Sequence, residues 1–200
     1  MSKKSVWSVK LSTASLVLIP AAVGVNYIGK LFAQLLKLPL WLDSIGTVLA
    51  SMLAGPIIGA LAGLINNIIY GFMDPVSFVY GITSVAIGVV VGLMARIGFL
   101  ENWVKAGIIA FAVIFTSTVV STPINIIFWE GQTGNIWGDA VYAGVLNITN
   151  TVWLASFLDE LIVDLPDKIL TVLIAYGIYR GLPKNLLQLY RADSEIEELK

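Results

Sequence analysis

The residue types of this chain exclude most familiar catalytic chemistry. Its 200 residues include no cysteine and no histidine, which excludes thiolate or imidazole metal ligands, thiol nucleophiles and serine-histidine-aspartate triads. No Gly-x4-Gly-Lys-[Ser/Thr] phosphate loop occurs, so ATP hydrolysis by that route is excluded. Asp159 and Glu160 are adjacent, and successive helical side chains diverge by about 100° instead of facing one substrate. We therefore expect no enzymatic activity, no catalytic residue, no metal and no cofactor.

The polar residues instead have the composition of a small-molecule pocket. Aromatic rings stack on planar ligands, and amides fix the orientation of a ligand by paired hydrogen bonds. The candidate ligand-binding residues are Asn26, Trp41, Asp43, Asn66, Asn67, Tyr70, Asn125, Trp129, Glu130, Trp137, Tyr142, Asn147 and Asn150. This set favours an uncharged or weakly charged heterocycle over a strongly anionic ligand.

Several of these residues also have an ordinary structural explanation. Asn66 and Asn67 could cap a helix or bond across helices, and Asp43 could cap the helix that follows it. Asn125 could satisfy backbone groups freed by a kink at Pro123. The tryptophans could be anchors at the membrane interface.

Two motifs in the last third of the chain are better explained by the helices that they form than by modification or ligand binding. Asn147-Ile-Thr149 matches a glycosylation sequon, a short pattern with many false positives, and we interpret Asn147 and Asn150 as one helical face. The run Asp-Leu-Pro-Asp-Lys over 164–168 is typical of a helix start, because proline is tolerated in the first turn and acids are stabilised by the positive end of the dipole.

The composition is that of an integral membrane protein forming a single domain over 1–200. Hydrophobic residues make up 58%, charged residues 12%, and the mean hydropathy is +0.87, whereas soluble domains are roughly 25% charged. Apolar segments predict membrane spans at 11–35, 45–54, 57–72, 76–97, 104–128 and 161–182. Gly55-Pro56 predicts a tight turn between the second and third spans. The basic start resembles a signal peptide, but without a convincing cleavage site we interpret it as part of the first span.

Charge counting decides the number of spans. The segment 129–160 is either a seventh span or an outer cap. With six spans and a cytoplasmic N-terminus, nine of the twelve Lys and Arg residues face the cytoplasm, as the positive-inside rule expects. We therefore expect an all-α, six-helix, multi-pass bundle with both termini cytoplasmic. The segment 129–160 is then an external lid or re-entrant element, and 183–200 is a cytoplasmic tail.

The polar residues gather in the outer halves of these spans. The inner halves, such as 48–53, 57–64 and 169–176, are almost wholly apolar. A channel or stand-alone carrier needs a polar path or a site with alternating access. The pattern therefore favours an outward-facing pocket above an apolar plug.

Two motifs carry a family resemblance. Leu-Asp-Ser-Ile-Gly-Thr over 42–47 and Leu-Ala-Gly-Pro-Ile-Ile-Gly-Ala-Leu-Ala-Gly over 53–63, together with six spans and a long fifth loop, resemble the substrate-binding S components of energy-coupling factor (ECF) importers. The resemblance implies capture of a water-soluble vitamin or related micronutrient at a bacterial plasma membrane. The implied partners are a membrane coupling (T) subunit and two ATPase subunits, with no nucleic acid. The resemblance also implies that the first and third external loops lid the pocket and that the bundle topples to release its ligand. Loop residues set the ligand in this family, and we prefer cobalamin or a nucleoside-like compound.

The face that docks the coupling subunit is less well marked. The family often carries an Ala-x3-Ala pair on the first span, which this chain lacks; Ser8 and Ser12 have the nearest spacing. Gly46, Ala50 and Ala54 form a second small-residue stripe. Such stripes let helices approach closely, either within the bundle or against another subunit.

Two other functions fit the same composition. A membrane sensor would bind the ligand without ATP-dependent uptake, and we expect it to need an output domain after the sixth span. A stand-alone proton-coupled carrier would transport by itself, which the apolar inner half argues against.

Overall fold

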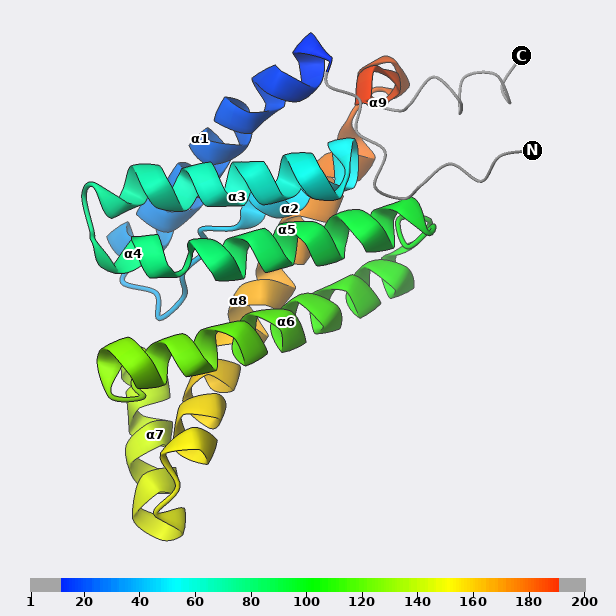
Figure 1. Cartoon of the computed structure of the whole chain (residues 1–200). Helices are drawn as coiled ribbons and strands as arrows, with labels where there is room; N and C mark the ends of the chain where they lie inside the picture. Colours follow the sequence, from blue (N-terminus) through cyan, green and yellow to red (C-terminus); the bar gives the residue numbers. More distant parts are fainter. Residues whose placement is uncertain (1–11, 191–200) are drawn as a thin grey trace.

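The computed structural model describes residues 12–190, which form helices without any strand among them. In chain order the helices are α1 (Thr13–Leu35), α2 (Ile45–Ala54), α3 (Pro56–Gly71), α4 (Val76–Val79), α5 (Gly81–Arg96), α6 (Trp103–Trp129), α7 (Ile136–Thr149), α8 (Val152–Gly181) and α9 (Lys184–Tyr190) (Figure 1). The all-α prediction is confirmed for this part of the chain.

Three of the helical segments within residues 12–190 are long and apolar enough to cross a membrane. They are α1, the consecutive helices α4 and α5 over Val76–Arg96, and α6. Helices α2 and α3 are apolar but shorter, and α8 is long but carries several charged residues. The helices thus agree with a membrane protein, as the composition predicts.

Helix α2 lies at the centre of the bundle. It contacts α1, α3, α5 and α8, and nine of its ten residues are buried, so its apolar sequence is explained by packing on all sides. It ends at Gly55, whose φ of +89° is a conformation that residues with a Cβ rarely adopt. Pro56 then begins α3, as proline does at the first helical position. The predicted Gly-Pro turn is confirmed.

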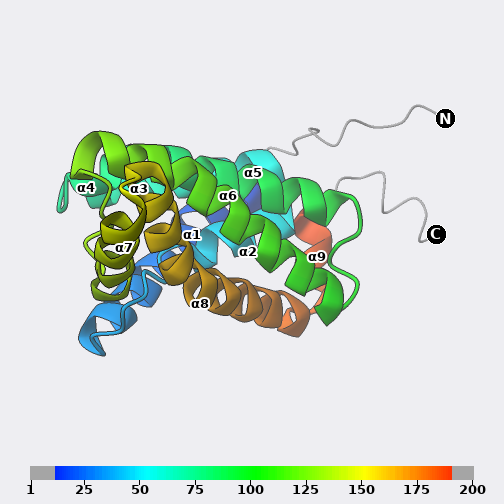
Figure 2. The same ribbon diagram turned by 90° about the horizontal axis from the view of Figure 1, so that it is seen from below.

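Helices α3, α5 and α6 run side by side across one face of the bundle (Figures 1 and 2). The glycines of α5 lie against the backbone of α3: a Cβ at Gly88 would be 2.5 Å from the Ala60 nitrogen, and one at Gly92 would be 2.3 Å from the Pro56 Cα. Small residues therefore set the spacing of these helices, as in other membrane bundles.

The stripe of Gly46, Ala50 and Ala54 is also used for packing inside the chain. All three residues are buried, and a Cβ at Gly46 would be 1.9 Å from the carbonyl oxygen of Ala22 in α1. Within the chain, α1 and α3 cover this stripe, which is the internal packing that the sequence offered as one alternative; docking of a coupling subunit here stays a prediction. Ser12 caps α1 by accepting from the Ser15 amide at 3.2 Å, and Ser8 lies outside the described residues.

The segment 129–160 forms α7 and the first turns of α8, which lie against each other. In Figure 1 this hairpin extends away from the other helices. Helix α8 begins at Val152 and continues through Pro166 to Gly181. The expected helix start at 164–168 is therefore wrong: Pro166 removes a single backbone donor, and the residues that follow it are buried against the bundle.

Candidate ligand-binding cavity

A cavity of about 570 Å³ opens where the α1–α2 connection, α4, the end of α6 and the middle of α8 come together. This volume lies within the range of roughly 300–1,000 Å³ found for small-molecule sites. The lining residues come from seven helices and their connections: Lys30, Trp41, Asp43, Ser44, Asn67, Asp74, Val76, Ser77, Tyr80, Thr83, Ser84, Ile87, Ser117, Ser121, Phe128, Trp129, Glu130, Gln132, Thr133, Gly134, Asp139, Glu160 and Lys168.

The wall of the cavity combines aromatic rings with carboxylates. Its four aromatic residues are Trp41, Tyr80, Phe128 and Trp129. Its charged residues are the five acids Asp43, Asp74, Glu130, Asp139 and Glu160 and the two bases Lys30 and Lys168. The charge on the wall is therefore predominantly negative.

An apolar core closes the cavity on the side of the α5–α6 connection. Along α5 the cavity lining ends at Ile87 and the core continues with Val91. Along α6 and α8 the corresponding core residues are Val113 and Val172, each fully buried. The cavity is thus open at one end of the bundle and blocked by tightly packed side chains at the other.

Glu160 is held at the cavity wall by a chain of hydrogen bonds that runs through α6 to the junction of α4 and α5. Asn125 in α6 is fully buried, and its Nδ2 donates to Glu160 Oε2 at 2.8 Å. The Tyr80 hydroxyl, between α4 and α5, donates to Asn125 Oδ1. Because the Asn125 Nδ2 group donates to Glu160, the amide oxygen of Asn125 faces the Tyr80 hydroxyl. Asn125 therefore positions Glu160 and is not used to satisfy backbone groups near Pro123.

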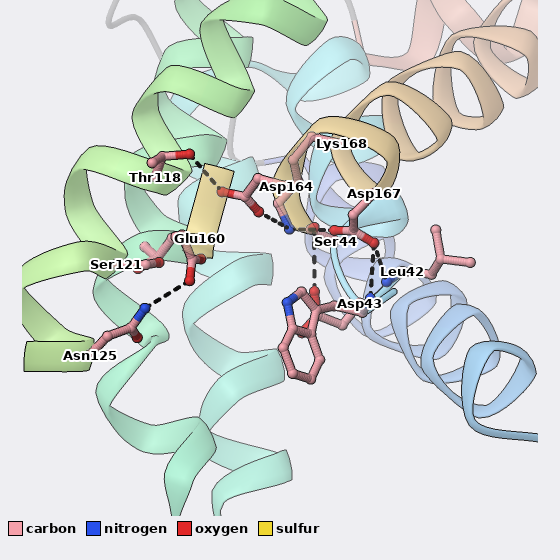
Figure 3. A network of polar contacts seen from close by, with 12 residues as sticks. Leu42, Asp43, Ser44, Thr118, Ser121, Asn125, Glu160, Asp164, Asp167 and Lys168 are labelled. Carbon is pink, nitrogen blue, oxygen red and sulfur yellow. Dashed lines mark hydrogen bonds and ion pairs between the residues drawn. The ribbon is translucent and has the colours of Figure 1, made fainter. Parts of the chain in front are cut away.

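One turn further along α8 lies a buried ionic cluster (Figure 3). Lys168 Nζ lies 2.6 Å from Asp167 Oδ2 and 3.5 Å from Asp164 Oδ1. Thr118 of α6 donates to Asp164 Oδ2 at 3.1 Å. All of these side chains are buried, and buried charges persist only when they are paired and hydrogen-bonded in this way.

The same cluster fixes the loop that carries Trp41. Asp167 Oδ1 accepts from the backbone N–H groups of Trp41 at 3.0 Å and Leu42 at 2.8 Å. Leu42 has a φ of +47°, which is unusual for a bulky residue and persists only where the surroundings determine it. The carboxylate of Asp167 therefore holds a strained backbone turn that presents the Trp41 ring to the cavity.

The turn at 130–135 covers the cavity from the side of α7. The Tyr142 hydroxyl donates to the Glu130 carbonyl at 2.7 Å. The Thr133 hydroxyl donates to Asp159 Oδ1 at 2.6 Å and its amide donates to Asp159 Oδ2 at 3.2 Å. Asp159 precedes the 161–182 segment expected to cross a membrane, and burial raises the pKa of its carboxyl to about 6.

Five of the residues expected to bind a ligand line the cavity: Trp41, Asp43, Asn67, Trp129 and Glu130. Two more support the lining from behind, namely Asn125 through Glu160 and Tyr142 through Glu130. The structure brings these seven residues together from α3, α6, α7 and the α1–α2 and α6–α7 connections.

The remaining expected residues lie outside the lining. Asn26 joins α1 to α2, donating to Thr47 Oγ1 at 3.0 Å and accepting from the Gly46 amide at 2.7 Å. Tyr70 stacks on Tyr27, with ring centroids 5.7 Å apart. The others have these positions: Asn66 is buried in α3, Trp137 is about half exposed at the start of α7, and Asn147 and Asn150 are exposed at its end.

Neither Asn66–Asn67 nor Asp43 acts as a helix cap. Both asparagines lie inside α3, where Asn67 Nδ2 donates to the Gly63 carbonyl at 3.0 Å and to Ser84 Oγ at 2.6 Å. For Asn67, the bond across helices is therefore the suggested role that is observed, through Ser84 of α5. Ser44 occupies the N-cap position of α2, one residue after Asp43.

The residues that sequence reasoning missed include Tyr80, Glu160 and Lys168. Glu160, Asp164 and Lys168 are spaced by four, which places them on one face of a helix, and this periodicity was the available signal. No comparable pattern marks Tyr80. The described residues contain no group of three or more Asp, Glu, His or Cys that could hold a metal ion.

Comparisons with protein-family models, with curated proteins and with solved structures gave no match to this chain.

Proposed function

We propose that this chain is the membrane-embedded substrate-capture subunit of an ATP-driven ECF-type importer. Its cavity takes up a water-soluble vitamin or related micronutrient, with a cobalamin or nucleoside-like compound as the preferred class. A membrane coupling subunit and two ATPase subunits supply the energy for transport. The support for the family assignment is the pair of motifs at 42–47 and 53–63.

The proposed topology has six membrane-crossing segments and both termini in the cytoplasm of a bacterial cell. The distribution of Lys and Arg supports this orientation. The cavity then opens outward, and the α5–α6 connection faces the cytoplasm. The turn at 130–135 acts as the lid over the captured ligand.

One observation carries the proposal: the cavity is open at one end of the bundle, and the apolar core around Val91, Val113 and Val172 blocks the other end. A channel or a self-sufficient carrier needs a polar path across the membrane. A capture subunit needs only a pocket on one side, because release requires a movement that its partners drive. The arrangement of polar and apolar residues therefore favours capture.

Native mass spectrometry on the detergent-purified chain, expressed in rich medium, tests this proposal. We expect one small molecule per chain in the wild type and its loss in Trp129→Ala, which removes a ring from the cavity wall. Trp103→Ala is the matched control, because Trp103 is half exposed at the far end of α6. The Trp103→Ala variant should still carry one bound small molecule per chain.

A second measurement separates capture from transport. Vesicles that contain only this chain should accumulate none of the molecule identified by mass spectrometry, with or without ATP. Uptake by the chain alone would contradict the capture proposal and favour a stand-alone carrier.

A further inference from the structure

Among residues 12–190, the acidic side chains of the cavity wall outnumber the basic ones. Five carboxylates and two ammonium groups line the wall. Both ammonium groups already have partners: Lys168 lies between Asp164 and Asp167, and Lys30 Nζ lies 4.0 Å from the centre of the Tyr70 ring. Adding Asp164 and Asp167 to the count makes the excess of negative charge larger.

Glu160 is the part of this excess that is most costly to leave unpaired. Its side chain lines the cavity and is only 6% exposed. Within residues 12–190, Oε2 accepts from the neutral Asn125 amide, and Oε1 has no hydrogen-bond or ion-pair partner. The nearest charged residues on its own helix are Asp159, Asp164 and Lys168, and Lys168 is paired with the two aspartates. Burial, together with the nearby Asp164 carboxylate, raises the pKa of the Glu160 carboxyl, so its charged form is strongly unfavourable until a cation pairs with it.

The aromatic side chains around Glu160 favour the same kind of partner. Trp129 and Tyr80 share the cavity wall with Glu160, and the faces of such rings attract cations. Trp129 Nε1 is buried without a hydrogen-bond acceptor in the described part of the chain, so a ligand with an acceptor atom would satisfy it. The wall thus provides a carboxylate, π-faces and one free donor.

We propose that the ligand of this cavity is an organic cation, with a positively charged nitrogen that pairs with Glu160 and a planar ring that lies against the aromatic wall. This inference rests on the proposed capture function and replaces the preferred cobalamin or nucleoside-like class with an organic cation. It differs from the expectation of an uncharged or weakly charged heterocycle, because the sequence alone does not show that Glu160 lies inside the cavity without a cation of its own.

A matched set of small aromatic probes tests the charge of the ligand. Benzamidine, benzamide and benzoate have nearly the same shape and carry a positive, zero and negative charge at neutral pH. Ligand-observed NMR titrations on the chain in detergent, at probe concentrations up to the millimolar range, give their affinities. We expect benzamidine to bind at least about tenfold more tightly than benzamide, and benzoate to show no binding.

Glu160→Gln keeps the size of the side chain and removes its charge. We expect it to abolish the preference for benzamidine over benzamide while benzamide affinity stays within about twofold. Glu101→Gln is the matched control, since Glu101 is exposed at the other end of the bundle. Its Oε2 lies 2.6 Å from Lys105 Nζ. The control should keep the tenfold preference. Thermal unfolding of both variants establishes that they remain folded.

Three outcomes would overturn the cation proposal. They are equal or tighter binding of benzamide, an unchanged preference in Glu160→Gln, and failure of all three probes to bind at millimolar concentration. If Glu160→Gln does not fold, 0.5 M NaCl replaces it as the test. A preference for benzamidine that salt does not weaken would then overturn the proposal. The co-purified molecule detected by mass spectrometry tests capture separately, so a neutral molecule there would disprove the cation and leave the capture function standing.

Discussion

Asp167 in α8 accepts hydrogen bonds from the backbone of Leu42, 125 residues earlier in the chain, at an N···O distance of 2.8 Å. The same carboxylate pairs with Lys168. One side chain thus supports both a buried cation and a strained turn.

Replacing Asp167 with alanine should destabilise the protein strongly. The change leaves Lys168 with only the more distant Asp164 and removes the acceptor for two backbone amides. Loss of one partner from a buried ion pair costs about 3–5 kcal/mol. Thermal unfolding in detergent, followed by tryptophan fluorescence, measures the effect. Asp167→Asn keeps an acceptor for the two backbone amides, so it should lose less stability than Asp167→Ala. An equal loss of stability in both variants would show that the hydrogen bonds to the loop contribute nothing.

Asn125 and Asn66 should respond very differently to substitution by alanine. Asn125 bonds to both Tyr80 and Glu160, so Asn125→Ala leaves the partly buried Tyr80 hydroxyl and the buried Glu160 carboxyl without these bonds, at a cost of about 2–4 kcal/mol. Asn66 is also buried, but its Oδ1 has no partner among the described residues. Asn66→Ala should therefore cost about 1 kcal/mol or less. Comparison of the two melting temperatures checks this, and similar losses would contradict the assigned roles.

Gly46→Ala should separate α1 from α2. The added Cβ would be 1.9 Å from the Ala22 carbonyl oxygen, so the helices must move apart and the bonds from Asn26 to α2 lengthen. We expect a loss of about 2 kcal/mol or more, as for an overpacked core. Gly24→Ala is the control, because its Cβ would meet nothing within 4 Å. That variant should match or exceed the stability of the wild type, since alanine favours helix formation.

The stability of the protein should depend on pH through Asp159. Burial raises the pKa of this carboxyl from 3.8 to about 6, so the folded state binds the proton more tightly than the unfolded chain does. The contribution is fully present below about pH 4 and is lost as the pH rises through about 6.

The difference in melting temperature between the wild type and Asp159→Asn isolates this effect from other titrating groups. Relative to the variant, the wild type should become less stable from pH 4 to pH 6 and then show no further change. A constant difference across this range would mean that Asp159 has an ordinary pKa in the folded protein.

The sequence predicts the helical segments well where hydropathy and turn residues agree. The short helix α2 and the turn at Gly55-Pro56 follow from the pattern alone, because glycine permits and proline begins the new backbone direction locally. The start of α8 is predicted nine residues too late, because charged residues interrupt the apolar run that marks a span. Packing against α6 and α7 stabilises that part of the helix, and local sequence carries little information about it.

Only part of the candidate site could be predicted from the sequence, because local sequence does not show which polar residues meet at the cavity. Trp41 and Trp129 are recognisable as ring-bearing residues near helix ends. Asn26 has the same polarity as Asn67, yet Asn26 joins two helices and only Asn67 lines the cavity. The difference depends on which neighbour lies 3 Å away, and contacts between distant segments decide that.

Helix α8 fixes the separation of two residues that shape the cavity. Glu160 and Asp167 are seven residues apart, so their attachment points are separated by about 10 Å along the helix axis. Glu160 is the carboxylate at one side of the cavity, and Asp167 fixes the loop that brings Trp41 to it. A ligand that pairs with Glu160 and contacts Trp41 is therefore held from two points of one helix, directly through Glu160 and indirectly through the loop that Asp167 anchors.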